Sequence, residues 1–261
     1  MSSVFSIKGN TVFITGEEYL PGPDHNSKSG PVYAADHETA AGLRAGAFLC
    51  SDVPRLQVTD KVWMSGQDGP GGLFIRLKAL SDFSISQGLE LSIMRKGFSL
   101  AWITLSDKGA RGQRVDESGP LIQEICSSGM DISLARGWVI PDDSLALRAL
   151  LVHLSLTAGF DLVITTGGTG LGPRDITPEA TLKVIDKRLP GFERAMVSSS
   201  LNKTPHAMIS RAVAGTLGLS LIMNLPGSPK GVRENLETAV PALEHALKKL
   251  QGDKSDCAPK V

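Results

Sequence analysis

The sequence predicts an α/β domain, with a mainly parallel sheet and helices on both faces, preceded by a small β-rich domain. Three observations predict this order. The chain has 261 residues, which suits two domains. Residues 1–97 carry short apolar runs between turn-rich pieces, as β domains do. From Phe98 onward, continuous apolar runs alternate with segments of helical period, which is the pattern of β-α-β units.

Composition and charge exclude several classes of protein. The 27 basic and 27 acidic residues cancel, which argues against nucleic-acid binding through a global field. No apolar run reaches the ~18 residues of a membrane span, so we expect no membrane segment. The N-terminus lacks the pattern of a signal peptide, so we expect a cytoplasmic protein. Neither the three scattered cysteines nor the five histidines have the spacing of a disulfide framework or a zinc site.

The first domain, residues 1–97, is expected to consist mainly of strands. Its apolar runs are "TVFIT", "AGAFL", "KVWM", "LFIRL" and "LELSIM". The pieces "PGPDHNSKSGP" and "SGQDGPGG" separate them as loops. Nothing in these residues points to one role, so binding of a ligand or partner and simple stabilisation stay open.

The second domain, residues 98–250, shows strands and helices in alternation. The expected strands are "SLAWITL", "WVI", "DLVITT" and "LSLIMNL". Leu147, Leu150, Leu151 and Leu154 have the spacing of one buried helix face. A second stripe runs from Val232 to Leu250, where we expect Pro241 to kink or split the helix. Residues 251–261 are expected to form a flexible tail.

A glycine-rich loop follows the third of these strands, in "TTGGTGLGPRDITPEAT". Its first residues are Gly167, Gly168, Thr169 and Gly170, and the glycines among them allow backbone N–H groups to approach a phosphate without a β-carbon in the way. Thr177 then suits an N-cap and Pro178 the first helical position. The spacing is neither a Walker A motif nor a Rossmann fingerprint. A plain glycine turn is the alternative, but the Arg-Asp pair directly after the loop favours an anion site.

Six motifs in register closely resemble the MogA/MoaB family of molybdopterin adenylyltransferases, which includes the G domain of gephyrin. They are the glycine string, "ITLSDKGARG", "VIPDD", "LPGFERAM", "TPHAMISRAVAG" and "LIMNLPGSPKGVRE". The resemblance implies transfer of AMP from ATP to molybdopterin with release of pyrophosphate, in molybdenum cofactor biosynthesis. It also implies a homotrimer and, as a further partner, the molybdenum insertase.

Two aspartates are the candidates for catalysis and for holding Mg²⁺. Asp142 follows the second strand and Asp175 follows the glycine loop, so both can face one crevice. The family pattern has essential aspartates at both positions, and Mg²⁺ prefers a few carboxylates with water and phosphate oxygens. Helix capping by one of the pair Asp142 and Asp143 is the structural alternative.

Other candidates for binding phosphate, pterin or nucleotide lie at neighbouring strand ends. The resemblance places Ser106 and Asp107 beside the ligand, with an Asx-type turn as the alternative. Arg174 and Arg211 suit phosphate oxygens, although surface ion pairs would also explain them. The last loop, "NLPGSPKG", offers Asn224, Gly227, Ser228 and Lys230, or is only a Pro-Gly turn.

A non-catalytic molybdopterin-binding or scaffold protein of the MoaB type is the competing function. The Arg174-Asp175 pair and the "TPHA" segment favour the active MogA type, because MoaB-type paralogues tend to lack both. The "RDITPEAT" string also agrees better with an adenylyltransferase than with an insertase. Retention of Asp142 and Asp175 speaks for catalysis.

Overall fold

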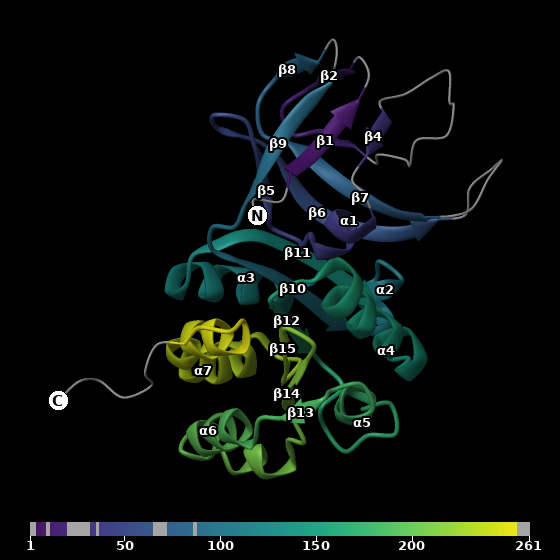
Figure 1. Ribbon diagram of the computed structural model, residues 1–261. Helices are drawn as coiled ribbons and strands as arrows, with labels where there is room; N and C mark the ends of the chain where they lie inside the picture. The colour runs from purple at the N-terminus through teal and green to yellow at the C-terminus, as the bar shows by residue number, and fades with distance from the viewer. Residues whose placement is uncertain are drawn as a thin grey trace. The chain divides into compact units, whose positions relative to one another are not determined.

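A computed structural model describes residues 4–8, 11–19, 32–34, 37–64, 72–85 and 88–254 (Figure 1). The chain divides into two compact units. Unit 1 comprises Met1–Gly97 with Thr157–Gly159, and unit 2 comprises Phe98–Leu156 with Phe160–Val261. The expected loop at 21–31, residues 65–71 of the second expected loop, and the tail from 255 onward lie outside the described residues.

Unit 1 is rich in strands, as the apolar runs predict. Among its described residues, seven strands form one antiparallel sheet in the order β3-β7-β6-β5-β9-β1-β4. A separate antiparallel pair joins β2 to β8, and one helix, α1, is present. The bounds are β1 (Val4–Lys8), β2 (Thr11–Phe13), β3 (Glu18–Tyr19), β4 (Val32–Ala34), α1 (His37–Gly42), β5 (Phe48–Cys50), β6 (Pro54–Met64), β7 (Gly72–Ala79), β8 (Phe83–Ile85) and β9 (Leu89–Met94).

Unit 2 is built on a sheet in the order β11-β10-β12-β15-β14-β13. Its strands are β10 (Phe98–Leu105), β11 (Ile132–Ile140), β12 (Leu162–Thr166), β13 (Lys187–Arg188), β14 (Ala214–Leu217) and β15 (Ser220–Leu225). The pairs among β11, β10, β12 and β15 are parallel. The pairs β15-β14 and β14-β13 are antiparallel, so the expectation of a mainly parallel sheet holds for only part of it. A two-residue turn joins β14 to β15, and such a short link permits only an antiparallel pair.

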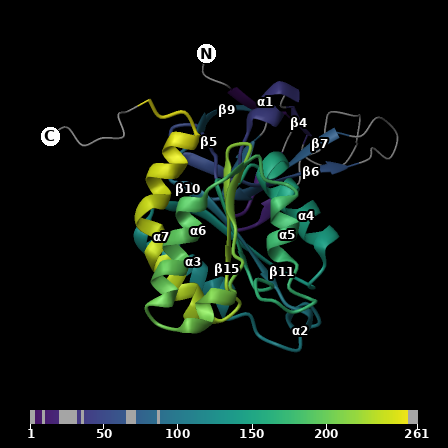
Figure 2. The same cartoon turned by 90° about the horizontal axis from the view of Figure 1, so that it is seen from below.

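Helices cover both faces of this sheet (Figures 1 and 2). Helices α3 (Ser118–Gly129), α6 (Pro190–Leu201) and α7 (Pro229–Leu250) pack together on one face. Helices α4 (Ser144–Val152) and α5 (Thr177–Leu182) lie on the other face. The remaining short pieces are α2 (Asp107–Ala110), a π-helical turn (His153–Ala158) after α4, and the 3-10 helix η2 (Pro205–Ile209). None of the described helices combines the length and apolar character needed to cross a bilayer.

The helical stripes pack as their spacing predicts, except that Leu150 is only half-buried and that the expectation for Pro241 needs correction. Leu147, Leu151 and Leu154 are buried, and five side chains of the α7 stripe join the same core as β10, β12 and β15: Val232, Leu236, Ala239, Leu243 and Leu247. The expected split at Pro241 is wrong, since α7 is continuous from Pro229 to Leu250. Pro241 is exposed, so its ring lies on the outer side of the helix and leaves the buried stripe intact.

The four parallel strands of unit 2 end at one edge of the sheet. Backbone hydrogen bonds connect the segments that leave them: Ser106 N–H to Ile140 O at 2.9 Å, and Gly167 N–H to Leu225 O at 3.2 Å. Ligands of open α/β sheets bind at this edge, beyond the carboxyl ends of the strands. The glycine loop and the "PGSPKG" loop both begin there.

Candidate active site

The glycine loop has a backbone that only glycine can adopt at its start. Gly167 and Gly168 have φ of +98° and +64°. A β-carbon on Gly167 would lie 2.6 Å from the Leu105 carbonyl oxygen, and one on Gly168 would lie 2.5 Å from Thr177 Oγ1. Thr177 fixes this shape, because its hydroxyl donates to Gly167 O at 2.8 Å and its N–H to Gly168 O at 3.0 Å.

Thr177 is therefore not the N-cap that the sequence suggests. Helix α5 begins at Thr177 itself, and the capping position falls on Ile176, which makes no side-chain cap hydrogen bond. The expectation is wrong because the Thr177 hydroxyl turns back to the glycine loop instead of accepting an N–H of the helix.

The same loop presents backbone donors that the protein leaves unpaired. Within the described part of the chain, the N–H groups of four consecutive residues, Gly168 to Leu171, have no hydrogen-bond partner. The next amide is used internally, since Gly172 N–H donates to Asp175 Oδ2 at 2.7 Å. Consecutive free amides are donors that an anion can accept from.

The second loop lies directly against the first. A β-carbon on Gly227 would come within 3.2 Å of the Gly167 α-carbon. Ser118 Oγ holds this loop by donating to Gly227 O at 3.0 Å. Ser228 is the N-cap of α7 and accepts from Gly231 N–H at 3.1 Å, while Lys230 is exposed in the first helical turn. The structure thus brings the positive end of α7 beside the glycine loop.

Asp107, Asp142, Asp175 and Arg174 come together at the strand ends. Asp107 accepts a hydrogen bond from Asp142 N–H at 3.2 Å and pairs with the Arg174 guanidinium, whose Nη2 lies 2.6 Å from Asp107 Oδ1. Burial, and the negative charges of Asp107 and Asp175, raise the pKa of Asp142, which Arg174 lowers in turn. Both candidate catalytic aspartates are half-buried and within electrostatic reach of each other.

Asp143 and Ser106 cap helices. Asp143 Oδ1 accepts from Ala146 N–H at 2.7 Å and so is the N-cap of α4. Ser106 Oγ accepts from Gly109 N–H at 3.0 Å and is the N-cap of α2. Capping by Asp143 leaves its neighbour Asp142 for the site.

Asn224 and Arg211 make their hydrogen bonds to other parts of the protein. Asn224 is fully buried, and its amide donates to Thr165 Oγ1 at 2.9 Å and Thr181 Oγ1 at 3.0 Å. It joins strand β15 to its neighbours instead of lining the loop surface. The Arg211 guanidinium is directed at the glycine loop and at Glu179.

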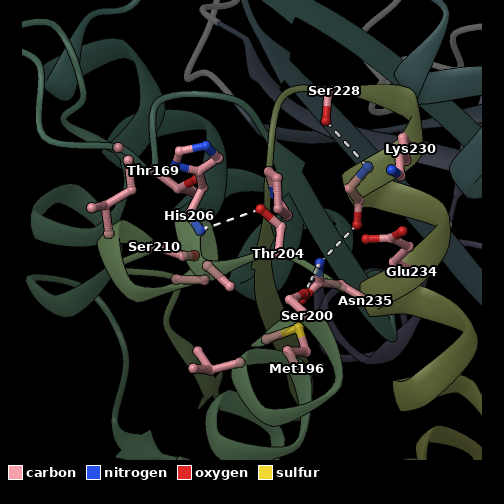
Figure 3. Close-up of a pocket in the computed structure, with 17 residues that line it drawn as sticks. Thr169, Met196, Ser200, Thr204, His206, Ser210, Ser228, Lys230, Glu234 and Asn235 are labelled. Atoms are coloured by element: carbon pink, nitrogen blue, oxygen red, sulfur yellow. Dashed lines mark hydrogen bonds between the residues drawn. The ribbon is translucent and has the colours of Figure 1, made fainter. Parts of the chain in front are cut away.

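A pocket of about 340 Å³ opens between the two loops, with α7 on one side and Thr169 and His206 on the other (Figure 3). Four of the candidate binding residues line it: Thr169, Gly170, Ser228 and Lys230. Its flanks are apolar, and its polar lining includes residues that the motifs alone did not single out. The apolar residues are Met196, Val197, Ala207, Ile209, Ala212 and Pro226, and the additional polar ones include Ser200, Thr204, Glu234 and Asn235.

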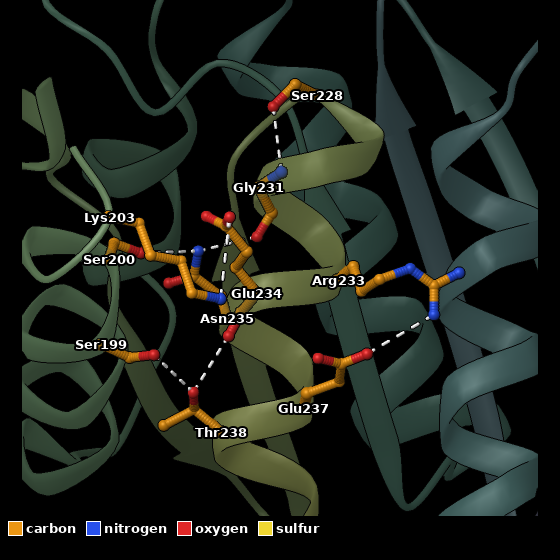
Figure 4. A network of polar contacts seen from close by, with 10 residues as sticks. All are labelled: Ser199, Ser200, Lys203, Ser228, Gly231, Arg233, Glu234, Asn235, Glu237 and Thr238. Atoms are coloured by element: carbon orange, nitrogen blue, oxygen red, sulfur yellow. Dashed lines mark hydrogen bonds and ion pairs between the residues drawn. The ribbon is translucent and has the colours of Figure 1, made fainter.

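The missed polar residues have a weak signal in the sequence. Lys230 and Glu234 are four residues apart, which places both on one face of α7. The network behind the pocket joins α6 to α7, where Asn235 Nδ2 donates to Ser200 Oγ at 3.2 Å and to Gly231 O at 2.7 Å (Figure 4). Thr238 Oγ1 adds a bond to Ser199 Oγ at 2.9 Å.

A second, more polar pocket of about 280 Å³ lies on the other side of the "PGSPKG" loop. Its lining includes Ser106, Gly227 and Ser228, together with Arg114 and Asp116, which sequence reasoning missed. Asp116 orders this wall by accepting from Thr104 Oγ1 at 2.8 Å and from Gly119 N–H at 3.0 Å. The two pockets share Ser228 and so flank one loop.

The acidic side chains suit a metal that is held mainly by other ligands. In the described ranges, no three His, Cys, Asp or Glu side chains are grouped to hold a metal ion by themselves. Asp107 is already paired with Arg174, which leaves Asp142 and Asp175. Two carboxylates completed by water and phosphate oxygens are the usual protein environment of Mg²⁺.

Comparisons with known proteins give the family of the second unit. Residues 101–245 match the family model described as "Probable molybdopterin binding domain". The chain is 41% identical over 152 residues to a molybdopterin adenylyltransferase of Helicobacter pylori, covering 58% of this chain and 86% of that protein. It is 38% identical over 157 residues to gephyrin of Dictyostelium discoideum, covering 56% of this chain but only 21% of the gephyrin.

Solved structures give the same picture for the α/β unit. A molybdopterin biosynthesis enzyme named MoaB, from Thermus thermophilus, superposes with a TM-score of 0.55 at 44% identity. The match covers 60% of this chain and 98% of the other. Because the family model spans more than half of the sequence, and the Helicobacter relative is matched over most of its length, the chain belongs to the molybdopterin-binding family of molybdenum cofactor biosynthesis proteins.

Proposed function

We propose that this protein is a molybdopterin adenylyltransferase, which transfers AMP from ATP to molybdopterin in molybdenum cofactor biosynthesis. The observation that carries the proposal is the unpaired amides of Gly168 to Leu171 beside the Asp142 and Asp175 carboxylates. Relatives of 38–41% identity that are named molybdopterin adenylyltransferases support the same reaction.

In the proposed reaction, a terminal phosphate oxygen of molybdopterin attacks the α-phosphorus of ATP. A new P–O bond forms, the bond between the α-phosphorus and the bridging oxygen to the β-phosphate breaks, and pyrophosphate leaves with that oxygen. Both reactants are anions, so the protein must hold them together against their repulsion. The free amides of the glycine loop and the amide end of α7 bind phosphate oxygens without adding negative charge.

We assign Asp142 and Asp175 to the metal, because Asp107 is engaged by Arg174. Mg²⁺ bound there would neutralise charge on the phosphates as the α-phosphate is transferred. Lys230, exposed at the start of α7, supplies a mobile positive charge at the pocket. Arg174 holds Asp107 and, through it, the backbone of Asp142.

We propose that residues 98–250 form the catalytic domain and that residues 1–97 are accessory. We also propose a cytoplasmic location, a homotrimer and the molybdenum insertase as a partner; the trimer and the insertase rest on the family resemblance. Sedimentation equilibrium measures the mass of the assembly, and a monomer at micromolar concentration would contradict the trimer.

Incubation of the purified protein with molybdopterin, MgATP and an inorganic pyrophosphate assay tests the function. We expect one pyrophosphate for each adenylylated molybdopterin, and none when molybdopterin is omitted. If molybdopterin binds but neither product appears, the protein is instead a non-catalytic binder of the MoaB type. Omission of Mg²⁺ should abolish turnover. Full turnover after addition of a metal chelator would show that the reaction does not need Mg²⁺.

A further inference from the structure

Arg211 contacts the glycine loop at three carbonyl oxygens. Its backbone N–H donates to Thr169 O at 3.1 Å. Its Nε donates to Gly170 O at 2.8 Å and its Nη2 to Asp175 O at 2.7 Å. The remaining guanidinium nitrogen, Nη1, pairs with the carboxylate of Glu179, in α5.

We propose that Arg211 is a positioning residue, which sets the glycine loop and Asp175 in their active arrangement without itself binding substrate phosphate. The inference rests on the proposed function for its kinetic consequence only. Each of the three guanidinium nitrogens has a partner in the protein, so three of the five N–H donors are used and the direction of the group is fixed. The sequence alone leaves phosphate binding and ion pairing equally open for this arginine.

Because peptide groups are planar, the contacts to these carbonyl oxygens also determine the direction of the neighbouring N–H groups in the loop. In a trans peptide, the C=O of one residue and the N–H of the next point in opposite directions. Because the carbonyls of Thr169 and Gly170 face Arg211, the N–H groups of Gly170 and Leu171 point away from it. These two N–H groups belong to the unpaired set that is available to an anion.

Arg211 also joins the two ends of the loop segment. The contacts to Gly170 O and Asp175 O bracket the bend that carries Arg174. Within this bend, Asp175 Oδ2 already accepts from Gly172 N–H. Arg211 thus fixes the backbone from which the Asp175 carboxylate projects.

Lysine cannot replace this arrangement. A guanidinium is a planar fork with donors in fixed directions, whereas an ammonium is a compact point charge. A lysine at this position would keep the charge but could not serve Gly170, Asp175 and Glu179 together. We therefore expect the order of the glycine loop to depend on the planar shape of the Arg211 guanidinium and not on its charge alone.

The first test compares Arg211→Lys and Arg211→Met with the wild-type protein in the adenylylation assay. We expect both variants to lose kcat by a similar factor, on the order of 100-fold, because small misplacements of reacting groups cost about that much. Arg233→Lys is the matched control, since Arg233 makes only surface ion pairs at 3.5 Å, and it should turn over normally. If Arg211→Lys stays near wild type while Arg211→Met raises the KM for ATP, Arg211 binds phosphate and the inference is wrong.

Chemical rescue separates a positioning role from a defect in folding. Millimolar guanidinium ion should restore part of the kcat of Arg211→Ala, and it should not change Arg211→Lys, where the ammonium occupies the site. Glu179→Gln weakens the ion pair that holds the Arg211 guanidinium without removing the guanidinium itself. We therefore expect a smaller loss of kcat than in Arg211→Ala. Absence of any rescue in a folded Arg211→Ala protein would contradict the inference.

Hydrogen exchange tests the loop independently of turnover. The amides of Gly172 and Asp175 are hydrogen-bonded within the bend, and their exchange should be faster in Arg211→Lys than in the wild type and unchanged in Arg233→Lys. If the wild-type protein makes no product, the proposed function fails, and this exchange measurement still decides whether Arg211 orders the loop. Unchanged exchange in Arg211→Lys overturns the inference.

Discussion

Asp107 accepts a hydrogen bond from the backbone N–H of Asp142 at 3.2 Å, across the ends of strands β10 and β11. Asp107 also pairs with Arg174, from the glycine loop after β12. One carboxylate therefore connects three segments that are far apart in the sequence. These contacts hold the parts of the candidate site together. They also place Asp142 close to charged side chains that shift its pKa.

The raised pKa of Asp142 gives a prediction for stability. Burial is the largest cause, so the folded protein binds a proton on Asp142 more readily than the unfolded chain does. The stabilisation by this proton is present below the ordinary pKa of 3.8 and is lost as pH rises through the higher folded value. In the absence of Mg²⁺, Asp142→Asn should therefore raise the free energy of unfolding at pH 7, measured by urea titration.

The gain from Asp142→Asn should shrink as the pH is lowered towards the ordinary pKa of an aspartate. If Asp142→Asn is less stable than the wild type at pH 7, the surroundings of Asp142 do not disfavour its ionised carboxylate. The combination of higher stability and lost activity is typical of a residue that serves function at a cost in stability.

Gly168→Ala should destabilise the protein and impair the loop. Its β-carbon would meet Thr177 Oγ1 at 2.5 Å, in addition to the cost of a positive φ. Gly112→Ala is the matched control, because Gly112 has φ +69° but open space around it. Thermal unfolding should show a loss of ~1–2 kcal/mol for the control and a clearly larger loss for Gly168→Ala. Equal losses of stability in the two variants would mean that Thr177 moves away from the new β-carbon at little cost.

Gly137→Ala tests the packing of Trp102 in the core. A β-carbon on Gly137 would lie 2.1 Å from Trp102 Cε2, so the indole ring must move. We expect a loss of ~1–3 kcal/mol in the free energy of unfolding, and Gly191→Ala, with nothing within 4 Å, should cost little. Trp102→Leu should relieve the clash in the double variant. Additive effects of the two substitutions would argue against direct contact.

Lys61, in unit 1, should make stability depend on alkaline pH. Burial is the main cause that lowers its pKa to about 8, although its ammonium donates to Ala41 O at 3.0 Å. Between about pH 8 and the ordinary value of 10.5, the unfolded chain holds a proton that the folded protein lacks, so the free energy of unfolding rises with pH. Comparison of the slope in wild type and Lys61→Met isolates this effect, because other groups titrate equally in both. Identical slopes would contradict it.

The fold of unit 2 was largely predictable because its apolar residues follow regular strand and helix patterns over long stretches. The apolar runs of β10 and β12 are buried, as strands covered on both faces require. The stripes of α4 and α7 gave their buried faces directly. The continuity of α7 through Pro241 was not predicted, because it depends on which side of the helix carries the ring. The antiparallel edge was not predicted either, because β14 was not expected as a strand.

The site was predictable where it depends on strand ends, and not where it depends on side-chain direction. Asp107, Asp142 and Asp175 meet because parallel strands end at one edge. Asn224 pairs in register with Thr165, inside the sheet, so its amide is buried although strand β15 ends one residue later. The sequence also could not show that Arg211 faces the loop carbonyls, since Arg211 lies about forty residues from the loop and is brought to it only by the fold.

The most direct test of the account is the rate of adenylylated molybdopterin formation by Asp175→Asn, compared with wild type at saturating MgATP. Asparagine keeps an oxygen for the Gly172 N–H, so the fold and the loop should remain while the negative charge is lost. We expect turnover to fall by about 100-fold or more, and Asp142→Asn to act likewise. Undiminished product formation by a folded Asp175→Asn protein would contradict the central claim that these two carboxylates carry the reaction.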